Sequence, residues 1–252
     1  MPLQRLSQLT ASERIAGANL QLGVTLAAVA GALNAGGFLA IGQYTSHMSG
    51  VVSNVADMLV LQRWDLVVAG LLSLLAFLGG AMSSALLVNF ARRRHSPNPY
   101  TTPLLLEAAL LLVFGLAGSQ LASRELVDLS LIAILLCYVM GLQNALVTKI
   151  SNAVVRTTHV TGLVTDIGIE LGKMVYWNRS GERGPEGRVR ANSQRLRLHA
   201  SLLAAFFLGG VMGALGFSRL GYIATLPLAS LLGLIALAPR AVAWGWFATR
   251  RN

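Results

Sequence analysis

Six long apolar runs dominate the sequence and restrict what the chain can fold into. As helices rising ~1.5 Å per residue, they have the length needed to cross the ~30 Å hydrocarbon core of a bilayer. Charged residues make up only 12% of the chain, about half of the ~25% found in soluble domains. We therefore predict an all-α polytopic membrane protein with an apolar outer surface. The runs are Ile15–Ala40, Leu66–Ala91, Leu104–Ala122, Leu126–Val147, Leu198–Phe217 and Leu220–Ala238.

The net charge of +10 does not indicate nucleic-acid binding, because the basic residues lie in short clusters between the apolar runs. That distribution is typical of cytoplasmic loops. The single cysteine, Cys137, excludes a disulfide framework and a cysteine metal cluster. Arg5 and Arg14 precede the first run, as in a cleavable signal peptide. We nevertheless expect this segment to be retained, because it ends in residues that recur later in the chain.

A short motif occurs twice, once in each half of the chain. His-x-[Ser/Thr]-Gly is followed by Ser53-Asn54 in the first copy and by Thr165-Asp166 in the second. Upstream of each copy stands an Asn-Ala pair at nearly the same offset. We infer an internal duplication, with repeats at residues 1–123 and 124–252 in one membrane domain. The recurring residues are Asn34, His47, Ser49 and Gly50 in the first repeat, and Asn144, His159, Thr161 and Gly162 in the second.

Each motif opens a shorter helix, which we place at about Met48–Gln62 and Val160–Tyr176. The first is too short to span a bilayer comfortably. Both carry polar or acidic side chains that are costly to expose to lipid, among them Asn54, Asp166 and Glu170. If both short helices enter and leave on one side, six spans remain.

The basic residues favour this six-span topology. It leaves only three of the 20 lysines and arginines outside, namely Arg63, Arg124 and Arg219, and puts both termini in the cytoplasm. A topology in which all eight segments cross would leave six outside. With three crossings in each half, the halves have opposite orientations in the membrane. The predicted fold is therefore six spans plus two short polar half-helices in two inverted repeats, a build typical of secondary transporters.

The residues Gly31 to Leu39 followed by His47-Met48-Ser49-Gly50 resemble the first signature of the YoaK-like family of bacterial membrane proteins. The second signature is similar to Gly141 to Ala145 with Thr157 to Gly162. Members of that family carry an acidic residue where this chain has Asn34, and an Asn-Met-Thr-Gly-Asn-like run where it has residues 47–51. The resemblance covers nearly the whole chain and implies a multispanning protein of the bacterial inner membrane. It implies no substrate or reaction.

A helix that begins at His-x-[Ser/Thr]-Gly presents free backbone N–H groups, a positive dipole end and hydroxyl groups, which together suit an anion. We therefore predict a central solute site at both motif copies. The alternative is that these residues only cap the helices and let them pack closely. The predicted site residues are Asn34, His47, Ser49, Gly50, Asn54, Asn144, His159, Thr161, Gly162, Asp166 and Glu170.

Further expectations concern individual polar residues. Asp166 and Glu170 share a helix face, where Glu170 either shares a proton with Asp166 or pairs with Lys173. Asn34 and Asn144 are expected to bond to each other. Asp57 has either a functional or an interfacial position, whereas Glu107 and His199 are read as interfacial.

No catalytic or phosphate-binding motif is present, and no cofactor or metal is predicted. We expect a transporter or channel for a small polar or anionic solute across the cytoplasmic membrane. The alternative is a membrane protein without transport, either a scaffold or an intramembrane enzyme using His47, His159 and Asp166. The expected partners are the bilayer and the solute, and homo-oligomer formation stays open.

Overall fold

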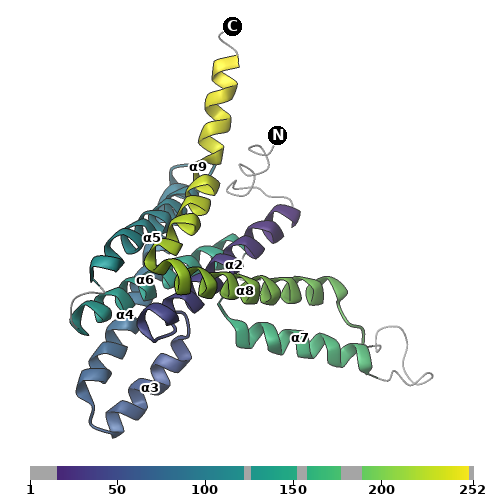
Figure 1. The fold of residues 1–252 in the computed structure, drawn as a ribbon. Coiled ribbons are helices and arrows are strands. Elements are labelled where there is room, and N and C mark those ends of the chain that lie inside the picture. Colours follow the sequence, from purple (N-terminus) through teal and green to yellow (C-terminus); the bar gives the residue numbers. More distant parts are fainter. Residues whose placement is uncertain (1–15, 122–125, 152–157, 177–188, 250–252) are drawn as a thin grey trace.

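The computed structural model describes residues 16–121, 126–151, 158–176 and 189–249, which are helical apart from short connections and contain no strand. Figure 1 shows crossing helices with two shorter helices, α3 and α7, extending on different sides. The elements are α2 (Ala16–Ile41), α3 (Met48–Val60), α4 (Trp64–Arg93), α5 (Thr101–Leu121), α6 (Leu126–Ile150), α7 (Val160–Val175), α8 (Ser193–Leu220), η2 (Gly221–Ala224) and α9 (Thr225–Thr249).

Four helical segments in the described part of the chain are long and apolar enough to cross a membrane. They are Leu20–Ile41, Trp64–Arg93, Leu131–Ile150 and Ser193–Ala238, and the last comprises α8, η2 and the start of α9. The described parts of α3 and α5, Met48–Val60 and Thr101–Leu116, are shorter apolar helices. Helix length and composition thus support the predicted all-α membrane class at the level of four candidate spans.

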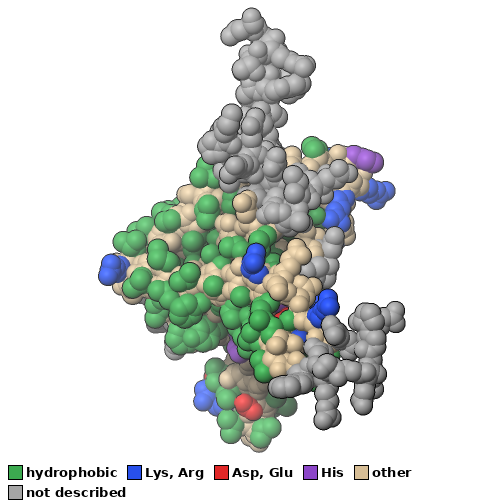
Figure 2. Space-filling model, turned by 90° about the vertical axis from the view of Figure 1, so that its right-hand side faces the viewer, with side chains coloured by type: hydrophobic (Ala, Val, Ile, Leu, Met, Phe, Trp, Pro, Cys, Tyr) green, Lys and Arg blue, Asp and Glu red, His purple; other side chains and the backbone are tan. Residues whose placement is uncertain are grey.

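The surface of the long helices is apolar, as the sequence predicts. Only 17% of the apolar window of α4 is buried inside the protein, although its mean hydropathy is 2.1. Its exposed side chains include Leu75, Leu78, Met82 and Leu86, which recur every three or four residues along one face. Hydrophobic side chains also cover much of the face drawn in Figure 2, with few lysines and arginines among them. Such a surface fits contact with lipid better than contact with water.

The helices of the two predicted repeats pack crosswise. Helix α2 packs most extensively on α8, whereas α4 packs on α6 and α5 packs on α9. Glycines bring the first two pairs into backbone contact. A Cβ at Gly209 would meet the Ala28 carbonyl of α2, and a Cβ at Gly80 would meet the Tyr138 carbonyl of α6. Since α3 folds back onto α4 and α7 onto α8, each short helix is held by the long helix that follows it.

The largest differences from the expected boundaries lie in the C-terminal half, where α9 begins at Thr225, not Leu220, and continues to Thr249, beyond the expected end at Ala238. The Asn34-Ala35-Gly36-Gly37 stretch lies within α2, which continues to Ile41, although paired glycines weaken a helix. Gly36 instead serves packing, since a Cβ there would meet the ring of Phe217. Helix α8 begins at Ser193, before the expected start at Leu198, because the Asn192 side chain accepts hydrogen bonds from two N–H groups of the first turn.

Candidate functional site

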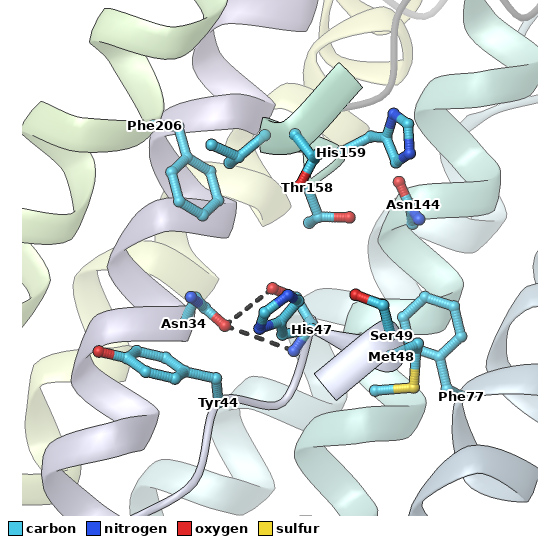
Figure 3. A pocket seen from close by; sticks show the side chains of 13 residues that line it. Asn34, Tyr44, His47, Met48, Ser49, Phe77, Asn144, Thr158, His159 and Phe206 are labelled. Atoms are coloured by element: carbon cyan, nitrogen blue, oxygen red, sulfur yellow. Dashed lines mark hydrogen bonds between the residues drawn. The ribbon is translucent and has the colours of Figure 1, made fainter. Parts of the chain in front are cut away.

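Both copies of the His-x-[Ser/Thr]-Gly motif line the same cavity, which has a volume of about 710 Å³. Figure 3 shows His47 with the start of α3 on one side and His159 with the start of α7 on the other. Six of the predicted site residues line this cavity. The full lining is Asn34, Tyr44, Ser46, His47, Met48, Ser49, Phe77, Asn144, Thr158, His159, Val160, Thr161 and Phe206.

Nearly all the lining residues form pairs, in which one residue comes from each half and the two occupy corresponding positions. Six positions of the first half each have a counterpart in the second, and only Tyr44 has none among the described lining residues. Asn34 corresponds to Asn144, the run Ser46 to Ser49 corresponds to the run Thr158 to Thr161, and Phe77 on α4 corresponds to Phe206 on α8. The cavity thus lies where the two halves meet.

Both helix starts at the cavity lack a side-chain cap. The N-cap residues are His47 and His159, with φ/ψ of −93°/67° and −85°/57°, and neither accepts a capping hydrogen bond through its side chain. The first intrahelical bonds run from the Val51 N–H to the His47 carbonyl and from the Leu163 N–H to the His159 carbonyl. The N–H groups of the first turn therefore stay available to a ligand at the positive end of each helix dipole.

The glycine of each motif makes room for the imidazole. A Cβ built on Gly162 would collide with Nδ1 of His159, and one on Gly50 would lie 3.2 Å from Nδ1 of His47. Each ring therefore folds back over the first turn of its own helix, closest in the second copy. This steric relation explains why histidine and glycine recur together at that spacing.

The asparagine pair is not joined directly. Oδ1 of Asn34 accepts hydrogen bonds from the Ser46 hydroxyl at 2.8 Å and from the Ser46 N–H at 3.3 Å, which fixes the segment just before α3. Oδ1 of Asn144 is buried and has no hydrogen-bond partner. The prediction that Asn34 and Asn144 bond to each other is therefore wrong, because Asn34 Oδ1 accepts from Ser46 instead. Asn144 is left with an unused acceptor at the cavity wall.

Two more predicted residues lie at an adjoining pocket. Gly50 and Asn54 line a cavity of about 380 Å³ between α2, α3 and α4. His47 lines both this pocket and the larger cavity, so it connects them. Asp57 is exposed further along α3.

The acidic residues of the second copy line neither cavity and lie at the contact between α7 and the start of α8. An Asp166 carboxyl oxygen is 3.7 Å from Nδ1 of His199, without a hydrogen bond between them. His199 is buried inside the protein, and its expected interfacial depth stays a prediction. Glu170 accepts hydrogen bonds from Lys173 at 2.9 Å and from the Asn192 N–H at 2.7 Å. Lys173 and the Asn192 N–H hold the pKa of the Glu170 carboxyl below its usual value. The expected pairing of Glu170 with Lys173 is confirmed.

Sequence reasoning missed several cavity residues. Ser46 and Thr158 could have been found, since each immediately precedes a motif histidine. Phe77 and Phe206 lie on other helices, and no pattern around the motif points to them. The complete burial of Glu107 inside the protein was also missed; Glu107 lies in the second turn of α5, which begins at Thr101. Its expected interfacial depth stays a prediction.

A comparison with protein families finds a match over most of the chain. Residues 22–238 match the model of a family described as Protein of unknown function (DUF1275). The chain belongs to this family. The match includes both motif copies and every residue of the cavity, so the lining described above lies wholly within the family domain. No curated protein and no solved structure matches the chain.

Proposed function

We propose that this protein transports a small polar or anionic solute across the bacterial cytoplasmic membrane, with the solute bound in the cavity between the two motif copies. The observation that carries the proposal is that two uncapped helix starts open into one cavity. Free N–H groups and helix dipoles favour anions. None of the lining residues that the structure describes is Asp, Glu, Lys or Arg, so no carboxylate among them opposes an anion.

The lining also suggests what kind of solute fits. Its volume lies within the range of ~300–1,000 Å³ that is typical of small-molecule sites. The wall contains hydroxyl, amide and imidazole groups, and Tyr44, Phe77 and Phe206 contribute aromatic surface. A small carboxylate with an apolar portion would use both kinds of surface.

We further propose that the two halves form inverted repeats with six spans, including α5 and α9 as separate crossings and both termini in the cytoplasm. The crosswise packing of α2 on α8 and of α4 on α6 supports this. A two-fold relation between the halves maps α2 onto α6 and α4 onto α8, so it converts the first pair into the second. A two-fold axis in the membrane plane would also bring α3 and α7 to the cavity from opposite faces. Rocking of one half against the other around the site would then give alternating access.

Transport is tested with purified protein in liposomes and a panel of small anions: acetate, lactate, succinate, benzoate and phosphate. We expect saturable uptake of at least one of them, with uptake lost in His159→Ala and His47→Ala. Gly233→Ala on α9 is the control, since a Cβ there meets nothing within 4 Å. If no anion enters above the rate of empty liposomes, the transport proposal fails and a membrane protein without transport is favoured.

Topology is tested by cysteine labelling in intact cells. Cys137 is buried and should not react. Leu61→Cys, after α3, should label from outside, whereas Ser96→Cys, after α4, should label only after the cells are opened. Labelling of Ser96→Cys from outside would refute the six-span topology and the inverted repeat together.

A further inference from the structure

Glu107 is a buried carboxyl that nothing in the proposed solute site uses. It lies on α5, has 0% exposure, and neither carboxyl oxygen has a hydrogen-bond partner among the residues that the structure describes. On the same helix, Leu104 and Leu111, one turn before and one turn after, and the adjacent Ala108 are apolar and buried. They belong to a core cluster built from several helices, including α2, α5, α6 and α9. An ionised carboxylate in such surroundings is very costly unless it is paired.

The titratable groups on the helices packed against α5 have other partners where their contacts are described. Arg92 of α4 donates to Tyr100 at 2.7 Å, and Lys149 of α6 donates to Asn89 at 3.0 Å. Tyr138 of α6 donates to Ser83 at 2.7 Å. The ring of Tyr222 in η2 packs edge-on against Phe114, and Cys137 of α6 is a buried thiol. In the described part of the chain, none of these groups pairs with Glu107.

The second buried glutamate shows what an ionised one requires. Glu170 has 2% exposure, and its two oxygens accept from the Lys173 ammonium and from the Asn192 N–H. Burial is therefore almost equal at the two positions, whereas the partners differ completely. A glutamate that is equally buried but unpartnered is best accommodated in its neutral form, with a proton on one oxygen.

The core around Glu107 extends toward the wall of the solute cavity. Leu104, Ala108 and Leu111 of α5 belong to the same buried cluster as Met140 and Leu146 of α6, which lie on either side of Gln143 in the sequence. The Gln143 Nε2 group donates to the Leu26 carbonyl, while its Oε1 is buried without a partner. The next residue, Asn144, lines the cavity.

We propose that Glu107 is a proton-binding site and that its proton is co-transported with the anionic solute. One carboxylate oxygen takes up the proton, which neutralises the side chain, and releases it on the other side of the membrane. Movement of one proton with one monovalent anion carries no net charge. A metal ion fits poorly here, since cations such as Na⁺ or Ca²⁺ need ~6 oxygen ligands. The described residues contain no group of three or more His, Cys, Asp and Glu suited to a metal.

The proton site is tested by infrared spectroscopy of the purified protein at neutral pH, which does not depend on transport. We expect a C=O band of a protonated carboxyl that Glu107→Gln removes and that Glu170→Gln, the matched buried control, leaves in place. Glu107→Asp keeps the carboxyl, and its band should persist at a shifted frequency. If Glu107→Gln removes no such band and Glu107→Asp shifts none, Glu107 is ionised and the proposal is wrong.

The coupling rests on the proposed transport function and is tested in the same liposomes with a transported anion of the panel that empty liposomes do not accumulate under the same proton gradient. A tenfold inward proton gradient should drive about tenfold accumulation in the wild type, because the two gradients are equivalent in free energy, and none in Glu107→Gln. Accumulation by this variant, or accumulation driven by Na⁺ at equal pH, would refute proton coupling through Glu107. If the wild type moves no anion, the transport proposal and this coupling fall together, and the infrared result still decides the proton site.

Discussion

Replacing Gly162 by alanine tests the relation between glycine and histidine at the cavity. The added methyl group would occupy the place of the His159 imidazole, so the ring must rotate away from the first turn of α7. Gly168→Ala is the matched control, because it lies on the same helix and its Cβ would meet nothing within 4 Å. Both substitutions gain the same helix propensity, about 1 kcal/mol.

The expected magnitudes follow from these contacts. Forcing an imidazole off its preferred rotamer costs about 0.5–1.5 kcal/mol, which offsets the propensity gain in Gly162→Ala but not in Gly168→Ala. The apparent melting temperature in detergent should therefore be about 2–4 °C lower for Gly162→Ala than for Gly168→Ala. Loss of one hydrogen bond to a charged solute costs about 1.5–3 kcal/mol. The KM for anion uptake should accordingly rise by roughly 10- to 100-fold in Gly162→Ala.

The readouts are thermal unfolding and uptake kinetics, measured on both variants and on Gly50→Ala. Gly50→Ala should fall between them, because its Cβ would lie 3.2 Å from the His47 ring, which needs to move by only a few tenths of an ångström. If Gly162→Ala matches Gly168→Ala in both melting temperature and KM, the imidazole does not depend on that space and the reasoning is refuted.

Two further predictions concern packing and pH. Gly80→Ala should destabilise the protein by about 1–3 kcal/mol, because its Cβ would meet the Tyr138 carbonyl. Gly79→Ala should be tolerated, because its Cβ would lie 3.8 Å from the Tyr138 ring. Equal melting temperatures of the two variants would contradict this prediction. The pKa of Glu170 is lower in the folded protein than in the unfolded chain, where it is ~4.3, so the ionised carboxylate stabilises the fold. This stabilisation is present above the unfolded pKa and is lost as the pH falls through the folded pKa. Wild-type protein should therefore lose more stability than Glu170→Gln on acidification below about pH 4, as melting temperatures across a pH series would show.

Several features were predictable because they depend on local sequence. Apolar composition and run length indicated helices with a lipid-facing surface, and most helix ends lie within a few residues of the expected positions. The repeated motif pointed to residues that do line one cavity, among them His47, His159 and Asn144. Whether a solute binds these residues stays a prediction.

Other features depend on which helices become neighbours. Helix α4 is apolar around nearly its whole circumference, so its sequence cannot show which face meets α6 and which stays exposed. The same ambiguity concealed Phe77 and Phe206 at the cavity and the complete burial of Glu107. Asp166 and Glu170 stand beside the motif in sequence, yet their partners on or just before α8 direct them away from the cavity.

The sequence by itself determined the helical membrane class and the duplicated motif, because hydrophobic length and residue spacing are properties of a single segment. Only the tertiary structure decided that both motif copies share one cavity and that Glu107 is left without a partner. Those outcomes follow from the crosswise packing of α2 on α8 and of α4 on α6, where glycines allow backbone contact between helices far apart in the chain.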